Sequence, residues 1–224
     1  MTVRTLILTG EGRYADPWHP FAETTDRLRE ILVGAGHDVA VRGDIDAAMA
    51  ELGGVDLLVV NAGDPWSDGE RGAPAASLAG FEAALERGMG VLAMHSAASS
   101  LRDYPSWAGA VGAIWLPELS FHPPHGDVDV RVERMPLPGL PGGFRVRDEK
   151  YCALQLTGRR EVVAWHSGAD EPGSGPEPAA WRRTLGHARI AVDVLGHDAR
   201  SYDSAGHRRL VEALAAWAAA ADDR

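Results

Sequence analysis

The residues best suited to chemistry follow a short apolar run, residues 90–94, which stops at His95 and Ser96. A run of about five apolar residues that ends at polar ones is typical of a buried parallel strand leading into a helix. Open α/β sheets bind ligands at the carboxyl ends of such strands, so both side chains are expected at a crevice. His95 suits acid–base catalysis or metal binding, and Ser96 suits substrate binding. The structural alternative is that Ser96 only caps the helix and His95 is hydrogen-bonded beneath a loop.

A nucleophilic serine is the weaker interpretation of this segment. Serine hydrolases with a nucleophile elbow carry glycines two residues before and after the serine, whereas Met94 and Ala98 stand at those places here. The single cysteine, Cys152, comes in no recognisable nucleophile context and is expected to be a buried structural thiol. One cysteine also excludes an internal disulfide and a thiolate metal cluster.

A second set of ionisable residues is the tetrad Asp148-Glu149-Lys150-Tyr151. Two adjacent carboxylates followed by a phenol suit acid–base work or cation binding. Extended alternation would place Asp148 and Lys150 on one face, and Glu149 and Tyr151 on the other. We expect Glu149 to be catalytic and Asp148 and Tyr151 to bind substrate; the alternative is a solvated charged turn.

Further imidazoles follow other expected strands. His197 comes after the apolar run 190–195, and Asp198 could orient its ring, unless the pair forms only a glycine turn with a capping aspartate. We assign His197 a catalytic role and Asp198, with His19 and His122, a role in substrate binding. The His122-Pro-Pro-His125 segment matches no strong zinc signature. Tryptophans in loops or at helix edges could be platforms for sugar rings or could belong to the core; they are Trp18, Trp66, Trp107 and Trp115.

The elements that must position these residues alternate along the first 94 residues as strand and helix, which favours a parallel sheet with right-handed crossovers. Expected strands are 5–9, 37–41, 55–60, 90–94, 128–132, 161–165 and 189–194. Expected helices are 20–34, 45–52, 75–87 and 206–221, with a helical turn at 107–111. The polar segment 64–74 and the Gly/Pro-rich segment 168–178 are expected to be loops. No linker divides the chain, so we expect one domain over residues 1–224.

Composition narrows the class of protein. The chain of 224 residues carries 22 basic and 32 acidic residues, a net charge of −10, which argues against nucleic-acid and anionic-membrane partners. No stretch approaches the ~18 apolar residues that span a bilayer, and no secretory signal is apparent. We therefore expect a cytoplasmic location.

The ordered set of motifs resembles the ThuA-like (trehalose utilisation) family over roughly residues 3–220. The motifs that carry the resemblance are Leu6-Ile7-Leu8-Thr9-Gly10, His19-Pro20, Met94-His95-Ser96-Ala97, Phe121-His122-Pro123, Asp148-Glu149-Lys150-Tyr151, Trp181 with Gly186, Leu195-Gly196-His197-Asp198, and Ala216-Trp217-Ala218. The family's usual Gly-Lys-Gly-Arg turn reads Gly186-His187-Ala188-Arg189 here.

The resemblance implies a flavodoxin-like three-layer α/β sandwich of the class I glutamine amidotransferase-like type, with a central, mostly parallel sheet. It also implies a link to disaccharide or keto-sugar catabolism. In amidotransferases of that fold a cysteine fills the elbow, so His95 at this place implies that glutaminase activity is absent. The matching positions are His95, His122, Asp148, Glu149, Tyr151 and His197, and a divalent metal such as zinc would suit His95 and His197.

The leading hypothesis is an enzyme, a hydrolase, lyase or isomerase, acting on a sugar derivative with His95, His197 and Glu149 as its acid–base residues. The alternative is a non-catalytic small-molecule binding or scaffold protein that keeps the amidotransferase-like shell. The apolar helix faces are compatible with a homodimer.

Overall fold

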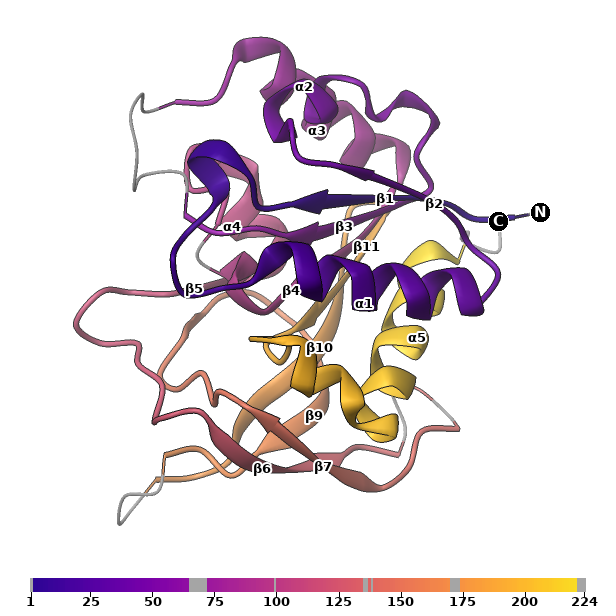
Figure 1. Cartoon of the computed structure of the whole chain (residues 1–224). Coiled ribbons are helices and arrows are strands. Elements are labelled where there is room, and N and C mark those ends of the chain that lie inside the picture. The colour runs from indigo at the N-terminus through magenta and orange to yellow at the C-terminus, as the bar shows by residue number, and fades with distance from the viewer. Residues whose placement is uncertain are drawn as a thin grey trace.

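The computed structural model describes residues 2–64, 72–98, 100–134, 137, 139–169 and 174–220. Within these residues nine strands form one sheet, in the order β2-β1-β3-β4-β11-β10-β9-β6-β7 (Figure 1). Its strands are β1 (Arg4–Thr9), β2 (Asp38–Arg42), β3 (Leu57–Asn61), β4 (Gly90–Met94), β6 (Gly126–Val132), β7 (Gly143–Asp148), β9 (Glu161–His166), β10 (Glu177–Leu185) and β11 (Ala188–Asp193). The short strands β5 (Ala113–Ile114) and β8 (Gln155–Leu156) pair separately.

The sheet is parallel from β2 to β11 and antiparallel from β11 to β7. Helices α1 (Phe21–Gly34) and α5 (Ala205–Ala219) cover one face, and α2 (Ile45–Ala50), α3 (Ala75–Arg87) and α4 (Pro105–Val111) cover the other. The central strands are mostly apolar along their middle residues because both of their faces are buried. In β1, for example, Leu8 packs toward α2 and α3 while Ile7 packs toward α1 and α5. The fold is therefore the α/β sandwich that the sequence predicts.

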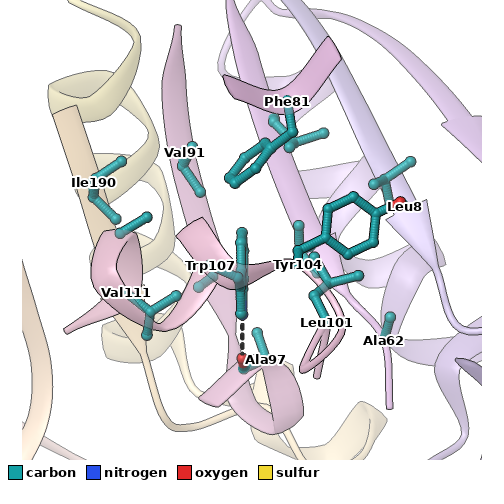
Figure 2. Packing of buried hydrophobic residues seen from close by; sticks show 14 of the residues in the cluster. Leu8, Ala62, Phe81, Val91, Ala97, Leu101, Tyr104, Trp107, Val111 and Ile190 are labelled. Atoms are coloured by element: carbon teal, nitrogen blue, oxygen red, sulfur yellow. Dashed lines mark hydrogen bonds between the residues drawn. The ribbon is translucent and has the colours of Figure 1, made fainter. Parts of the chain in front are cut away.

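Hydrophobic packing between α4 and the sheet holds the turn that follows β4 in place. Trp107 is buried among Phe81, Val91 and Tyr104, and its indole nitrogen donates a hydrogen bond of 2.9 Å to the carbonyl of Ala97 (Figure 2). Ala97 belongs to the 3-10 helix His95–Ala98. The core thus holds the backbone on which His95 stands.

The antiparallel half differs from the elements expected from the sequence. Neither β7 nor β10 is predicted, and β10 begins at Glu177, inside the segment 168–178 expected to be a loop. In β7 only Val146 and Asp148 are buried, and strand pairing to β6 rather than an apolar run defines it. The expected loop 64–74 lies mostly outside the described residues. No helix in the described part of the chain is long and apolar enough to cross a membrane.

His166, at the end of β9, makes the stability of this half depend on pH. Its Nε2–H donates to the carbonyl of Tyr151 at 3.0 Å, and its Nδ1 accepts from the backbone nitrogen of Gly168 at 3.0 Å. Burial lowers the pKa of His166 from 6.5 to about 4. The unfolded chain therefore binds the proton first, and the stabilisation present above pH 6.5 is lost as the pH falls toward 4.

We expect the free energy of unfolding to fall by up to about 3 kcal/mol over that interval because of this residue. Urea unfolding of the wild type and of His166→Gln, measured with a chelator between pH 4 and pH 7, checks it. The variant keeps a side-chain donor but does not titrate, so its stability should fall less steeply. Parallel pH profiles for the two proteins would contradict the assignment.

Candidate active site

His95 stands on a strained turn at the end of β4. Its backbone φ is +41°, a left-handed conformation that non-glycine residues rarely adopt and that clusters at functional sites. The side chain is 2% exposed. Its Nδ1–H donates to the carbonyl of Val194, just after β11, at 2.8 Å, which leaves the lone pair on Nε2. The hydroxyl of Tyr151 donates to that Nε2 at 3.0 Å.

His19 comes from the loop between β1 and α1. The Asp16 carboxylate accepts from its Nδ1–H at 2.8 Å and also from the backbone nitrogens of Trp18 and His19. Burial lowers the pKa of His19, and this effect exceeds the opposing pull of Asp16. The ring is thus neutral near pH 7, with its lone pair on Nε2. A carboxylate behind an imidazole in this way is the arrangement that orients metal-binding histidines.

His197 lies three residues after Val194, directly after Gly196. Gly196 has φ +118°, and a Cβ there would come within 2.6 Å of the Tyr202 hydroxyl, so glycine is required at this turn. The His197 Nδ1 lies 3.3 Å from Glu149 Oε2. Among the described residues this buried nitrogen has no hydrogen-bond partner of acceptable geometry.

The three imidazoles form a nearly equilateral triangle. Ring centroids of His19 and His95 are 5.0 Å apart, those of His19 and His197 are 5.0 Å apart, and those of His95 and His197 are 5.3 Å apart. One donor atom from each ring and one oxygen of Glu149 lie within 4.8 Å of one another. Zinc ligation requires each donor atom to lie ~2.0–2.2 Å from the ion, so the four side chains would have to close in around an ion bound among them.

Glu149 is the carboxylate to which the imidazoles converge. Besides His197, its oxygens lie 3.6 Å from His95 Nε2 and 3.4 Å from His122 Nδ1. Burial alone would raise the pKa of Glu149, but His197 and His95 outweigh it and hold that pKa far below its ordinary range. Burial likewise would lower the pKa of His197, yet Glu149 raises it. At neutral pH Glu149 is therefore ionised and can accept a proton or bind a cation.

A cavity of about 470 Å³ opens above this cluster, within the size range of small-molecule sites. It is lined by Asp16, Trp18, His19, Asp64, Arg102, Trp115, His122, Glu149, Tyr151 and His197. His95 lies directly beneath, in contact with Tyr151. The structure thus brings together six of the nine site residues that the sequence nominates: His19, His95, His122, Glu149, Tyr151 and His197.

Ser96 and Asp198 are placed elsewhere. Ser96 is 2% exposed, does not line the cavity, and donates its hydroxyl to the carbonyl of Ala62 at 2.9 Å. Asp198 caps the 3-10 helix Ala199–Asp203 and pairs with Arg200 and with His125. Neither side chain is in a position to touch a ligand in this cavity.

Asp148 also does not line the cavity. Its carboxylate oxygens instead bind the backbone of the segments that carry Glu149 and His197. The residue is 1% exposed. It accepts from the backbone nitrogens of Glu149 at 2.8 Å, Gly196 at 2.8 Å and His197 at 3.2 Å. The Ser201 hydroxyl donates to it as well. Asp148 therefore clamps the segment that carries Glu149 to the turn that carries His197, which is a positioning role and not substrate binding.

The clamp continues into the core on the α5 side. Ser201 Oγ lies 2.9 Å from His207 Nδ1, and His207 Nε2 lies 3.1 Å from Asp193 Oδ2. Asp193 in turn accepts from the backbone nitrogen of Leu195 at 3.0 Å. Ser201, His207 and Asp193 are completely buried. This Ser–His–Asp series is thus a structural network and is not exposed to substrate.

We expect Asp148→Asn to lower the free energy of unfolding by ~2–4 kcal/mol, because an amide group must face N–H donors that the carboxylate satisfied. The control is Asp127→Asn on neighbouring β6, where the carboxylate is exposed and 3.8 Å from Arg147. Denaturant unfolding of both variants checks the prediction. Equal stabilities would show that the Asp148 contacts contribute little.

The sequence did not single out several residues of the cavity. Asp16 stands three residues before His19, a spacing that allows the observed carboxylate–imidazole pair, and this was the available signal. The sequence contains no comparable signal for Asp64 and Arg102, because 38 positions separate them along the chain. They come together only in the folded structure, where Arg102 Nη1 lies 3.3 Å from Asp64 Oδ2. Trp18 and Trp115 line the cavity, whereas Trp107 belongs to the core and Trp66 lies outside the described residues.

Comparisons with known proteins agree with this fold. The structure resembles that of a ThuA-like protein from Parabacteroides merdae with a TM-score of 0.79 and 19% identity, covering 100% of this chain and 93% of that one. A ThuA-like protein from Bacteroides uniformis gives a TM-score of 0.72 and 19% identity, covering 94% and 89%. A beta-galactosidase from Rahnella sp. R3 gives 0.59 and 14%, covering 93% of this chain and 30% of that one.

At these identities the likeness shows the fold alone. A search of curated proteins gave no match. The family model described as trehalose utilisation matches residues 4–218. The chain therefore belongs to the ThuA (trehalose utilisation) family.

Proposed function

We propose that this protein is an enzyme of disaccharide or keto-sugar catabolism that uses acid–base chemistry at the His19–His95–His197 cluster, assisted by a divalent metal such as zinc. The observation that carries the proposal is the convergence of three imidazoles and one ionised carboxylate at the floor of a cavity. Groups that are this costly to bury together are typical of functional sites.

The donor set fits a metal ion. Imidazole nitrogens and a carboxylate oxygen suit zinc and its neighbours. His19 and His95 each use Nδ1–H on a fixed acceptor and direct Nε2 inward. The buried, unsatisfied His197 Nδ1 supplies the third nitrogen. A divalent ion held there would supply Lewis-acid polarisation of a substrate oxygen.

Glu149 and Tyr151 would handle the proton. Glu149 is ionised at neutral pH and lines the cavity, so it serves as the general base or as the fourth ligand. Burial raises the pKa of Tyr151 well above its ordinary value, so its hydroxyl stays protonated and can donate a hydrogen bond to a developing negative charge. Glu149 Oε2 lies 3.6 Å from His95 Nε2 and the Tyr151 hydroxyl lies 3.0 Å from it. A metal ion bound to that nitrogen would displace the tyrosine hydrogen bond and leave the hydroxyl available to the substrate.

The walls of the cavity suit a sugar. Trp18, 71% exposed, and Trp115 offer aromatic faces on which the C–H groups of a pyranose ring can pack. Asp64 and Arg102 add polar groups that can pair with hydroxyls. The description of the family as trehalose utilisation supports a disaccharide-derived substrate.

The proposal is tested by measuring metal content and turnover on the same preparation. We expect about one divalent ion per chain by mass spectrometry and turnover of a keto-disaccharide derived from trehalose. Chelation should abolish turnover and the metal should restore it. A preparation that binds the sugar but neither holds metal nor turns it over would favour the scaffold protein instead.

A further inference from the structure

A second cavity, hereafter the hollow, has a volume of about 760 Å³. It lies at the start of β11, whereas the candidate active site lies beyond the end of that strand. Arg189, at the start of β11, lines it, whereas the carbonyl that holds His95 belongs to Val194 beyond the end of that strand. Five residues of strand separate the two, roughly 17 Å. The hollow is therefore separate from the histidine cluster.

Arginine dominates the lining of this hollow. Five arginines from the loop before β9, from β10 and from β11 surround it, with Glu161 as the only carboxylate among the lining residues. They are Arg159, Arg160, Arg182, Arg183 and Arg189. The whole chain has a net charge of −10, so this local concentration of positive charge contrasts with its acidic composition.

Glu161 neutralises only one of these charges. Its carboxylate pairs with Arg182, with an Nη2–Oε2 distance of 2.6 Å. The Arg182 guanidinium also lies over the ring of Trp217, 5.0 Å from its centroid. This pair holds one guanidinium rigidly at the edge of the hollow.

Arg160 and Arg183 meet neutral acceptors instead. Arg160 donates to the carbonyls of Gly112, Thr157 and Gly158, and Arg183 donates to that of Thr157. Burial lowers the pKa of both guanidinium groups, and the charge of Arg183 lowers that of Arg160 further. The fold therefore holds two like charges close together at an electrostatic cost.

The backbone is shaped to hold Arg183 in this place. Gly112 and Gly158 both have positive φ, and a Cβ on them would come within 1.8 Å and 2.7 Å of the guanidinium nitrogens. Two glycines thus make the space that the guanidinium fills. Its Nε is buried and has no hydrogen-bond partner among the described residues.

We propose that this hollow binds the phosphate group of a small molecule. A phosphate carries about two charges and several acceptor oxygens, which match planar guanidinium forks better than a monocarboxylate does. Bound there, it would offset the repulsion between Arg160 and Arg183. A nucleic acid is disfavoured because the rest of the acidic surface would repel an extended polyanion.

Calorimetric titration with inorganic phosphate, pyrophosphate and a sugar phosphate tests the proposal and distinguishes free phosphate from an ester. Excess chelator is present, so that no anion can bind through a metal at the histidine cluster. The informative variant is Arg159→Gln, because this exposed side chain lines the hollow and its loss should leave folding intact. Arg182→Gln adds a second, and Arg145→Gln, exposed on β7 beside Asp129, is the matched control.

We expect at least one of the three anions to bind, with affinity that weakens as salt is raised. Arg159→Gln and Arg182→Gln should each weaken it about tenfold, while Arg145→Gln leaves it unchanged. Circular dichroism confirms that the variants fold. The proposal would be overturned if none of the probes bound at 10 mM, about the weakest affinity of interest. Equal affinity in all variants would overturn it as well.

Discussion

Replacing Glu149 by glutamine is expected to reduce turnover of a keto-disaccharide by about 10²- to 10⁴-fold. The amide has nearly the same shape but cannot accept the proton that the ionised carboxylate takes. The imidazoles of His95, His122 and His197 lie within 3.6 Å of this carboxylate. The variant therefore also loses the negative charge that raises the pKa of His197. Steady-state kinetics should show the loss in kcat.

Metal content of the same variant separates the two roles open to Glu149. If Glu149 acts only as the general base, the variant should still hold its metal ion. If Glu149 is the fourth ligand, the variant should bind the ion more weakly. Glu82→Gln is the control, since this carboxylate on α3 accepts a hydrogen bond from Ser106 at 2.9 Å and does not line the cavity above the histidine cluster. Full activity in Glu149→Gln would remove the residue from the chemistry and would leave the cluster without its base.

Replacing His19 by alanine is expected to weaken binding of Zn²⁺ by about 100-fold or more. Structural zinc sites bind with ~10–16 kcal/mol, so each of four ligands accounts for roughly 3 kcal/mol. Asp16→Asn, which removes the acceptor behind His19, should weaken binding by about 10- to 100-fold. Competitive titration against a chromophoric chelator at pH 7 measures both.

The matched control is His187→Ala, because this exposed imidazole lies at the turn between β10 and β11, outside the cluster. Its affinity for Zn²⁺ should equal that of the wild type. If His19→Ala and His187→Ala bind the ion equally well, the triangle of imidazoles is not a metal site. In that case His95 and Glu149 would have to act without an ion.

The fold and the elbow histidine were accessible from local pattern. Residues 90–94 form an apolar run that ends at a polar pair, and the structure places His95 at the end of β4 as that pattern predicts. Helix α3 begins and ends where its apolar stripe and Gly88 predict. Short parallel strands buried on both faces leave a strong signal, since they form nearly continuous apolar runs.

The antiparallel half was less accessible for a physical reason. Strands β7 and β10 owe their conformation to hydrogen bonds with β6, β9 and β11, which are distant in sequence. The alternation in β7 is short, with Phe144 and Val146 alternating with arginines, and β10 includes Pro178 near its start, so the local pattern for both strands is weak. The result was a loop expected where β10 begins.

The sequence by itself determined which chemical groups are available: imidazoles and carboxylates after strands, no cysteine at the elbow, and an acidic surface. Only the tertiary structure decided which of them meet. His95 and His197 follow the ends of β4 and β11, His19 comes from the loop between β1 and α1, and the sheet order places these strands near one another. The tertiary structure also turned Asp148 inward to clamp two backbone segments, and gathered five arginines at the far edge. Strand order and side-chain burial depend on long-range pairing and packing, which residue types and spacing do not encode locally.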